Sequence, residues 1–350
     1  MVGPLVFAVP GALDTPTGGY TYDRRMIAEL TRLGWRVDVL DLGNEFPRPS
    51  AATRAAARAK LAAVPSSMPI VVDGLAFGVL PDVAEALSRT HRLVALVHHP
   101  LALESGLTGE AAQALRVSER AALAGARRIV TTSAATARVL ISDYGVPPKR
   151  LTTAPPGTDK AQPARGSGNA TVALLAVGAV VPRKGYDVLI AALATLDDLP
   201  WRLTIAGDRT RDPATADRLA RDIAGRCLSD RVTIAGTVSD ERLEALYGGA
   251  DLFVLPSRYE GYGMGFAEAI AHGLPVIGTN AGAIPDTVPA GTGLLVPPDD
   301  VAALAAALRQ LIADADERGR LAAAARAAAA QLPTWADAAV LFAGAIEAAA

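Results

Sequence analysis

Two glutamates flank a glycine-rich stretch in the second half of the chain, PSRYEGYGMGFAE at residues 256–268, which contains Glu260 and Glu268. Its three alternating glycines let backbone N–H groups approach a ligand closely. A helix beginning there would aim its free N–H groups and positive dipole end at the same space. Because carboxylates accept paired hydrogen bonds from diols, we expect a ligand with a hexose at one end and a ribose at the other. A loop with two solvated glutamates is the plainer interpretation, since Gly-x-Gly patterns are weak signals.

A pair of cations precedes this stretch by some seventy residues. Arg183 and Lys184 follow a predicted buried strand and come just before Gly185 and the predicted start of a helix. Two adjacent positive charges in such a loop can offset a diphosphate. The alternative is an ordinary exposed basic pair.

The first half of the chain carries two further candidate loops. Gly18 and Gly19 stand between a predicted strand and a predicted helix that starts at residue 22, so they would give a flexible turn at a helix N-terminus. His98 and His99 follow another strand, where an imidazole can bind a sugar hydroxyl or a charged oxygen. We favour His99 for the ligand because Pro100 fixes the chain directly after it.

Weaker candidates complete this half. Asp73 and Gly74 follow a strand, but both are common turn formers. Ser133 also follows a strand, and we expect it to cap the next helix.

Short apolar runs alternate with longer amphipathic stretches along the whole chain, which predicts parallel sheets covered by helices on both faces. A segment rich in Pro, Gly and Ala at residues 155–168 interrupts the alternation and is interpreted as a linker between two domains. Ligands of such sheets bind beyond the carboxyl ends of the strands. The predicted strands are residues 5–9, 36–40, 70–72, 93–97 and 128–132, then 171–177, 202–206, 232–235, 252–255, 275–278 and 293–296.

Helices are predicted between these strands. After residue 301 the chain is rich in alanine and helical in pattern, Pro333 interrupts it, and residues 335–349 form a last helix. The other predicted helices are residues 22–33, 51–62, 81–88 and 113–124, then 186–195, 213–227, 240–248 and 263–272.

Composition limits the classes of function. The chain has 350 residues, enough for two domains, and its net charge of −2 gives no sign of a nucleic-acid partner. A single cysteine forms neither an internal disulfide nor a metal cluster, and the first apolar run is too short to span a membrane. We therefore expect a cytoplasmic protein.

Several motifs together resemble the retaining glycosyltransferases of family 4. The most specific likeness is to the E-x7-E region of that family, and the likeness in the first half is looser. The matching segments are EGYG and EAIAHGLPVI (residues 260–263 and 268–277), VG and PRKG (177–178 and 182–185), IAGD (205–208), PPGTD (155–159) and Gly18-Gly19.

The resemblance implies a GT-B fold: two Rossmann-like, doubly wound parallel-sheet domains of the α/β class, facing an interdomain cleft. The expected N-terminal domain, which binds the acceptor, is residues 1–156 together with a last helix, 334–350, that crosses back to it. The expected C-terminal domain, which binds the donor, is residues 157–333. Two positions depart from the family pattern, Pro156 for Asn and Tyr262 for Phe, and neither removes a needed charge.

The resemblance also assigns roles to residues. Arg183 and Lys184 would hold the donor diphosphate, Glu260 the hexose hydroxyls, Glu268 the ribose, and His99 would lie near the donor sugar. The catalytic set is thus Glu260, Arg183, Lys184 and His99, and the remaining donor-binding set is Gly18, Gly19, Gly207, Asp208, Gly261, Tyr262, Gly263 and Glu268.

The implied activity is transfer of a hexose, with retention, from a UDP- or GDP-sugar to a hydroxyl of a glycan, a lipid or a small metabolite. No cofactor is expected, and no metal, because side chains meet the phosphate charge; the acidic pair Asp314 and Asp316 lies in the helical tail. A lipid acceptor would bring the protein to the inner face of the membrane. The oligomeric state and the identities of sugar, base and acceptor stay open.

Three other functions fit parts of the pattern. A nucleotide-sugar epimerase would share the two-domain architecture but use no acceptor. An NAD-dependent dehydrogenase would explain Gly261-x-Gly263-x-Gly265, although the third glycine is misplaced for that fingerprint. A binding protein with a decayed site is the third, and the complete set of charged residues speaks against it.

Overall fold

The computed structural model describes residues 3–15 and 17–349, and these form two compact units. Unit 1 contains the chain up to Gly157 together with the segment from Pro333 onward, and unit 2 is Thr158–Leu332. The predicted limits were 156 and 334 for the first domain. Residues 154–170, which include the predicted linker, form neither helix nor strand.

Unit 1 is built on a six-stranded parallel sheet in the order β2-β1-β3-β4-β5-β6. Strands β1, β3 and β4 are almost wholly buried because helices cover both faces, which explains why their sequences read as continuous apolar runs. The strands are β1 Pro4–Val9, β2 Arg36–Asp41, β3 Pro69–Asp73, β4 Arg92–Val97, β5 Arg128–Thr131 and β6 Leu151–Thr153.

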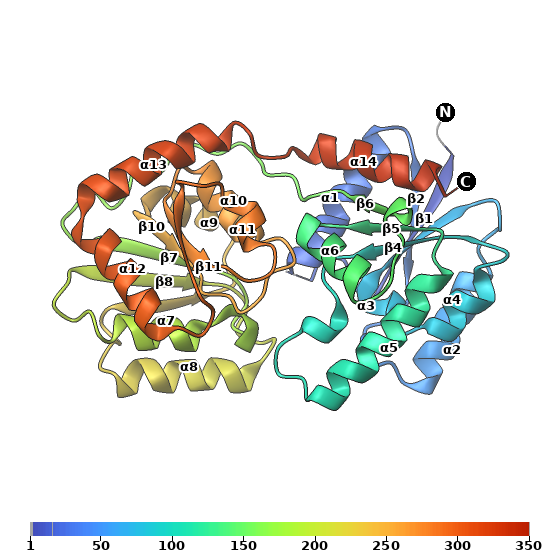
Figure 1. Ribbon diagram of the computed structural model, residues 1–350, viewed down its shortest axis with the longest axis horizontal. Coiled ribbons are helices and arrows are strands. Elements are labelled where there is room, and N and C mark those ends of the chain that lie inside the picture. Colours follow the sequence, from blue (N-terminus) through green and yellow to red (C-terminus); the bar gives the residue numbers. More distant parts are fainter. Residues whose placement is uncertain (1–2, 16, 350) are drawn as a thin grey trace. The chain divides into compact units, whose positions relative to one another are not determined.

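Helices α1 and α14 lie on one face of this sheet, and α2, α4 and α5 on the other (Figure 1). The last helix, α14, packs on α1, β5 and β6, and its Phe342 is fully buried against the rings of Phe7 and Tyr22. The helices are α1 Gly18–Arg32, α2 Ala51–Ala62, α3 Gly74–Phe77, α4 Pro81–Leu87, α5 Gly109–Gly125, α6 Ala134–Ser142 and α14 Trp335–Glu347, with 3-10 turns η1 Leu101–Leu103 and η2 Pro148–Arg150.

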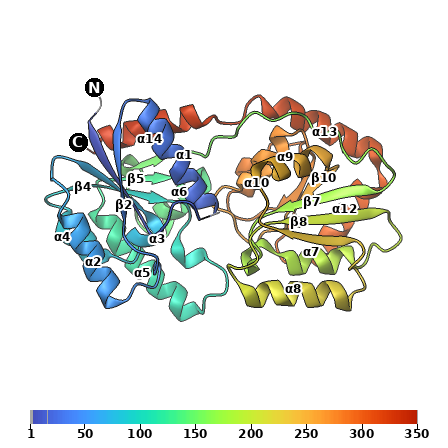
Figure 2. The ribbon, with the colours of Figure 1, turned by 180° about the vertical axis from the view of Figure 1, so that it is seen from behind.

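Unit 2 also contains a six-stranded parallel sheet, in the order β12-β11-β10-β7-β8-β9. Helices α7 and α8 cover one face and α9 and α10 the other (Figure 2). The strands are β7 Val172–Val177, β8 Trp201–Ala206, β9 Val232–Gly236, β10 Leu252–Val254, β11 Val276–Thr279 and β12 Gly293–Val296; the helices are α7 Tyr186–Leu193, α8 Pro213–Gly225, α9 Asp240–Gly249, α10 Met264–Ala271, α11 Ile284–Thr287, α12 Val301–Ala313 and α13 Ala315–Ala329, with the 3-10 turn η3 Pro182–Lys184.

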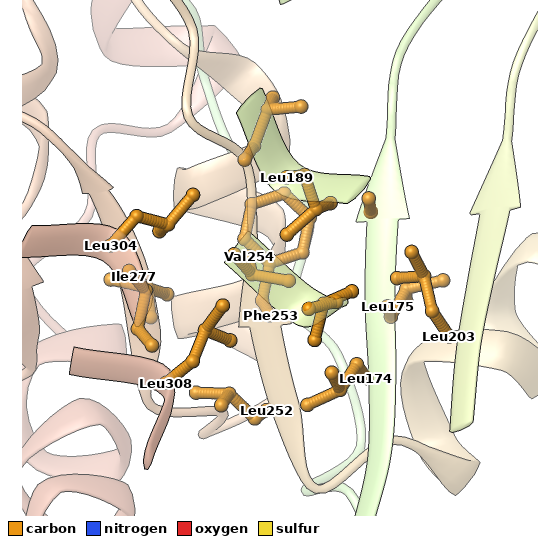
Figure 3. Packing of buried hydrophobic residues seen from close by; sticks show 14 of the residues in the cluster. Leu174, Leu175, Leu189, Leu203, Leu252, Phe253, Val254, Ile277, Leu304 and Leu308 are labelled. Carbon is orange, nitrogen blue, oxygen red and sulfur yellow. The ribbon is translucent and has the colours of Figure 1, made fainter. Parts of the chain in front are cut away.

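The core of unit 2 forms where the central strands meet the helices. Figure 3 shows Leu189 of α7 close to Val254 of β10 and Leu308 of α12 close to Leu252, with Leu174 and Leu175 on the adjacent strand β7. Strands β7 and β10 of this core are followed directly by the loops that carry Arg183 and Glu260, respectively. Packing therefore fixes where those loops begin.

The predicted doubly wound parallel sheets are confirmed, with three local differences. Helix α1 begins at Gly18 and not at residue 22, because the Thr17 side chain accepts a hydrogen bond from the backbone N–H of Tyr20 and caps the helix four residues earlier. Strand β6 is too short to give a sequence signal. The alanine-rich tail is divided at Asp314, which caps α13. None of the helices in the described part of the chain is long and apolar enough to cross a membrane.

Replacing Phe342 by alanine should destabilise unit 1. The change leaves a cavity between two aromatic rings, and such a truncation costs about 3–5 kcal/mol. Val340→Ala on the same helix is the control, because Val340 is 60% exposed and should change stability by less than about 0.5 kcal/mol. Urea unfolding followed by circular dichroism measures both, and equal midpoints would contradict the packing of α14.

Candidate active site

The order of the strands in unit 2 creates a natural binding position. The chain proceeds outward from β7 to β8 and β9 on one side and from β10 to β11 and β12 on the other, so β7 and β10 are neighbours at the point where the order reverses. In sheets of this kind ligands bind beyond the carboxyl ends of the two strands at that point. The loop after β7 contains η3, and the loop after β10 contains the glycine-rich stretch.

These two loops are joined by charged side chains. Glu260 lies 2.6 Å from Nζ of Lys184 through Oε1 and 3.0 Å from Nη1 of Arg183 through Oε2. The Ser257 hydroxyl donates to the same Oε1 at 2.6 Å, and Arg183 also donates to the carbonyl of Tyr259 at 2.8 Å. All three charged side chains are less than 20% exposed. The geometry therefore brings Arg183, Lys184 and Glu260 into one group.

The charges of this group depend on one another. Burial alone would raise the pKa of Glu260, but Lys184 and Arg183 outweigh it and lower that pKa to about 2. Glu260 is thus ionised at every physiological pH. Two cations against one carboxylate leave a net charge of +1, which favours an anionic ligand.

Close backbone contacts hold both loops in place. Gly185 has φ 68°, and a Cβ atom there would lie 2.1 Å from the carbonyl oxygen of Pro256. Gly207, at the end of β8, lies so close to Gly178 that a Cβ atom would meet its carbonyl oxygen at 2.0 Å. Only glycine fits either position, so the small residues of the PRKG and IAGD motifs set the spacing of the loops.

The second glutamate, Glu268, lies one helical turn into α10 and apart from the cation group. Its Oε2 accepts a hydrogen bond of 2.8 Å from the hydroxyl of Tyr247, whose ring stacks on His272 with centroids 4.8 Å apart. Burial raises the pKa of Glu268, and the Tyr247 hydrogen bond opposes that rise. The tyrosine therefore orients the Glu268 carboxylate.

The other predicted residues of unit 2 shape the loops. Gly263 has φ 97° and is the N-cap of α10, so the backbone N–H groups of the first turn are not capped by a side chain. Gly261 and Tyr262 lie in the turn before it, and burial raises the pKa of Tyr262 to about 12. The Asp208 carboxylate accepts from the backbone N–H of Thr210 at 2.7 Å, which lowers its pKa and shapes the loop after β8.

A second polar cluster lies at the equivalent point of unit 1, where the order of strands reverses between β1 and β3. Nε2 of His98 lies 3.2 Å from Asp23 of α1 and 3.1 Å from Asp73, the last residue of β3. Both aspartates are buried. Gly19, in the first turn of α1, lies against the same ring, since a Cβ atom there would be 3.4 Å from Cδ2.

The structure thus brings His98, and not the favoured His99, next to the glycines of α1. His99 lies 3.4 Å from Glu104, with 24% of its side chain exposed, and is outside the cluster. Pro100 follows directly and is the N-cap residue of η1. The place near the donor sugar that the resemblance gives to His99 stays a prediction.

Burial and charge also act on this cluster. Burial raises the pKa of Asp23, the neighbouring Asp73 raises it further, and the result is about 7. For His98 burial alone would lower the pKa, but the two carboxylates raise it to about 10. Among the described residues these three are close enough to share a metal ion, with ligand atoms within 4.8 Å of one another.

Sequence reasoning missed several of these side chains. Asp73 was considered only as a turn former, although it caps α3 through Oδ1 and contacts His98 through Oδ2. Asp23 and Tyr247 lie inside helices, where nothing in their local sequence separates them from surface or core residues. Ser133 does cap α6 as predicted.

Known proteins resemble both halves of this chain. The family described as "Glycosyltransferase Family 4" matches residues 16–162, and "Glycosyl transferases group 1" matches residues 159–328. Among solved structures, sucrose-phosphate synthase from Thermosynechococcus elongatus has 23% identity and a TM-score of 0.81 over 97% of each chain. HepE of Anabaena in complex with UDP-glucose has 20% identity and a TM-score of 0.81, covering 98% of this chain and 99% of that one.

Curated relatives agree with these matches. A mannosyltransferase of Mycolicibacterium hassiacum, "MMP alpha-(1->4)-mannosyltransferase", is 29% identical over 83% of this chain and 72% of its own length. "D-inositol 3-phosphate glycosyltransferase 1" of Catenulispora acidiphila is 34% identical over 60% of this chain and 54% of its own length. The two parallel sheets with their flanking helices, and the similarity to these solved structures, define the GT-B class of fold. The chain belongs to glycosyltransferase family 4, a family of sugar-transferring enzymes.

Glu260→Gln should destabilise unit 2, because it leaves two partly buried cations without their carboxylate. Breaking such a group costs about 3–5 kcal/mol. The pKa of Glu260 falls from 4.5 to about 2 on folding, so its contribution is complete above pH 4.5 and is lost as the pH falls toward 2. The difference in unfolding free energy between wild type and variant should therefore shrink between pH 5 and pH 3.

Glu317→Gln is the matched control, since it removes one surface ion pair with Arg320, and solvent-screened pairs of this kind contribute little to stability. A Glu260→Gln loss no larger than that of the control, or one independent of pH, would contradict the charge balance described here.

Proposed function

We propose that this chain transfers a hexose from a nucleoside diphosphate sugar to a hydroxyl of an acceptor. The observation that carries the proposal is the group of Arg183, Lys184 and Glu260 at the strand reversal of unit 2. A net positive, mostly buried group beside an uncapped helix N-terminus suits a diphosphate. A carboxylate fixed by two cations at the same place suits sugar hydroxyls.

Each charged residue has a part in this reaction. The bond between the sugar C1 and the β-phosphate oxygen breaks, and a bond from the acceptor oxygen to C1 forms. Negative charge then grows on the departing diphosphate, where Arg183, Lys184 and the first turn of α10 stabilise it. Glu260 orients both cations before the substrate arrives, and Glu268, held by Tyr247, takes the ribose hydroxyls.

The reaction is proposed to retain the configuration at C1. Attack on the face from which the diphosphate leaves lets that diphosphate take the acceptor proton, so no side chain is assigned as a base. The family match does not favour the epimerase or dehydrogenase alternatives. The position of the glycines also speaks against a dehydrogenase. The glycines at 261–265 follow β10, the fourth strand of unit 2, whereas the dinucleotide-binding fingerprint follows the first strand of its domain.

The nucleotide is proposed to be UDP or GDP. HepE was solved with UDP-glucose, which supports a uridine diphosphate sugar, and the donor of the mannosyltransferase relative is a mannosyl compound by its name. The acceptor is a hydroxyl of a glycan, a lipid or a small metabolite. We propose that the protein acts in the cytoplasm, at the membrane surface if the acceptor is a lipid.

Nucleotide preference can be measured by thermal shift with UDP, GDP, ADP and NAD. We expect UDP or GDP to raise the melting temperature, since ligand at 100 times its dissociation constant stabilises by about 2.7 kcal/mol. Stabilisation by NAD alone would overturn the proposal.

Retention is tested separately. With the preferred donor and an acceptor panel, proton NMR of the product reports the configuration at C1, and inversion would refute retention.

Lys184→Met should lower kcat by about a hundredfold or more, the loss expected when one group that stabilises developing charge is removed. Lys149→Met is the control, because Lys149 is exposed in unit 1 and is outside every site described above. Initial rates with the preferred donor test the pair. Unchanged turnover in Lys184→Met, with folding intact, would remove Lys184 from the mechanism.

A further inference from the structure

The imidazole of His98 is held in an unusual way. Oδ2 of Asp73 accepts a hydrogen bond from Nε2 at 3.1 Å, and Oδ1 of Asp23 makes an ion pair with the same nitrogen at 3.2 Å. Two carboxylates thus share one ring nitrogen. The other ring nitrogen, Nδ1, makes no hydrogen bond or ion pair within the described part of the chain.

Each carboxylate is fixed by the fold. Asp73 ends β3, and its second oxygen accepts from the backbone N–H of Leu75 at 2.7 Å, so the side chain cannot turn without breaking the cap of α3. Asp23 lies in α1 with no exposed surface, and neither of its oxygens has a hydrogen bond of good geometry among the described residues. Burial and the neighbouring Asp73 raise the pKa of Asp23 to about 7, and above that pH a buried carboxylate with so little compensation requires a nearby positive charge.

The other described groups that contact the His98 imidazole carry no positive charge that could stabilise Asp23 and Asp73 in its place. The Tyr22 ring meets the imidazole edge to face, with centroids 5.4 Å apart, and Gly19 lies against the Cδ2 edge. The Thr132 hydroxyl donates to the His98 carbonyl oxygen and fixes the backbone. Among the described residues, the ionisable groups that contact the ring through an ion pair or ring packing are Asp23 and Tyr22 from α1 and Asp73 from β3, and none of these three is a cation.

We propose that Asp23 and Asp73 are positioning residues that keep His98 an imidazolium and direct its Nδ1–H toward an oxygen of a substrate bound at the carboxyl edge of the unit 1 sheet. This inference rests on the proposed function for the identity of that oxygen, but not for the state of the ring. His98 then donates a charged hydrogen bond, which strengthens as negative charge grows on its partner. It does not serve as a base, because a base must be unprotonated at the working pH.

The wild-type protein tests this directly. With 15N-labelled histidine the chain gives four imidazole signals, and the spectrum of His98→Gln identifies the one of interest. We expect both nitrogens of His98 to show protonated shifts from pH 6 to pH 9. A His98 ring that is neutral at pH 8 overturns the proposal, whether or not sugar transfer has been detected.

Variants separate positioning from mere stability. Asp73→Asn should lower the midpoint of the His98 titration by at least one pH unit, and the exposed Asp38→Asn should leave it unchanged. In rate measurements Asp73→Asn should lower kcat more than it changes KM for the donor. It should also move the alkaline limb of the kcat profile to lower pH, with partial recovery in Asp73→Glu.

Two results would refute this role. A lower melting temperature in Asp73→Asn with an unmoved titration and an unmoved alkaline limb would make the aspartate purely structural. Selective broadening of the His98 signal by micromolar Mn2+ would make the three residues a cation site. If no donor supports transfer, the proposed function fails while the titration still decides the state of His98.

Discussion

The balance between one buried carboxylate and two cations determines the character of unit 2. Glu260 is stable as an anion because Lys184 and Arg183 lie within 3.0 Å and outweigh the cost of its burial, and its carboxylate in turn helps to hold both cations in place. The group has a net charge of +1 inside a largely buried site, where electrostatic interactions are stronger than in water. The diphosphate of the proposed donor would meet hydrogen-bond donors there that need little reorganisation.

That balance depends on the order of the strands. Arg183 and Glu260 are more than seventy residues apart, and they meet because β10 pairs with β7 where the direction of winding reverses. Gly185 and Gly207 then permit backbone approaches that no side chain would allow. A fold that placed β10 elsewhere in the sheet would leave the same residues as solvated surface charges.

Unit 1 uses the same position with the opposite charge. Its strand order also reverses, between β1 and β3, and the residues gathered there are two aspartates around one imidazole. In unit 2 cations predominate and favour an anionic ligand, whereas in unit 1 carboxylates predominate and favour a protonated histidine. The two sheets are alike, and the chemistry differs because of the residues that follow the strands.

The sequence by itself determined the elements and the strongest motif, because apolar periodicity, glycine spacing and charge order are local properties. It predicted nearly every strand, the loop at residues 256–268 and the cation pair at 183–184. It favoured His99 over His98, and it left Asp23 and Tyr247 unnoticed. Only the tertiary structure decided the places of these residues. Asp23 and Tyr247 lie inside helices, and each becomes part of a site because the fold brings a residue from another element beside it.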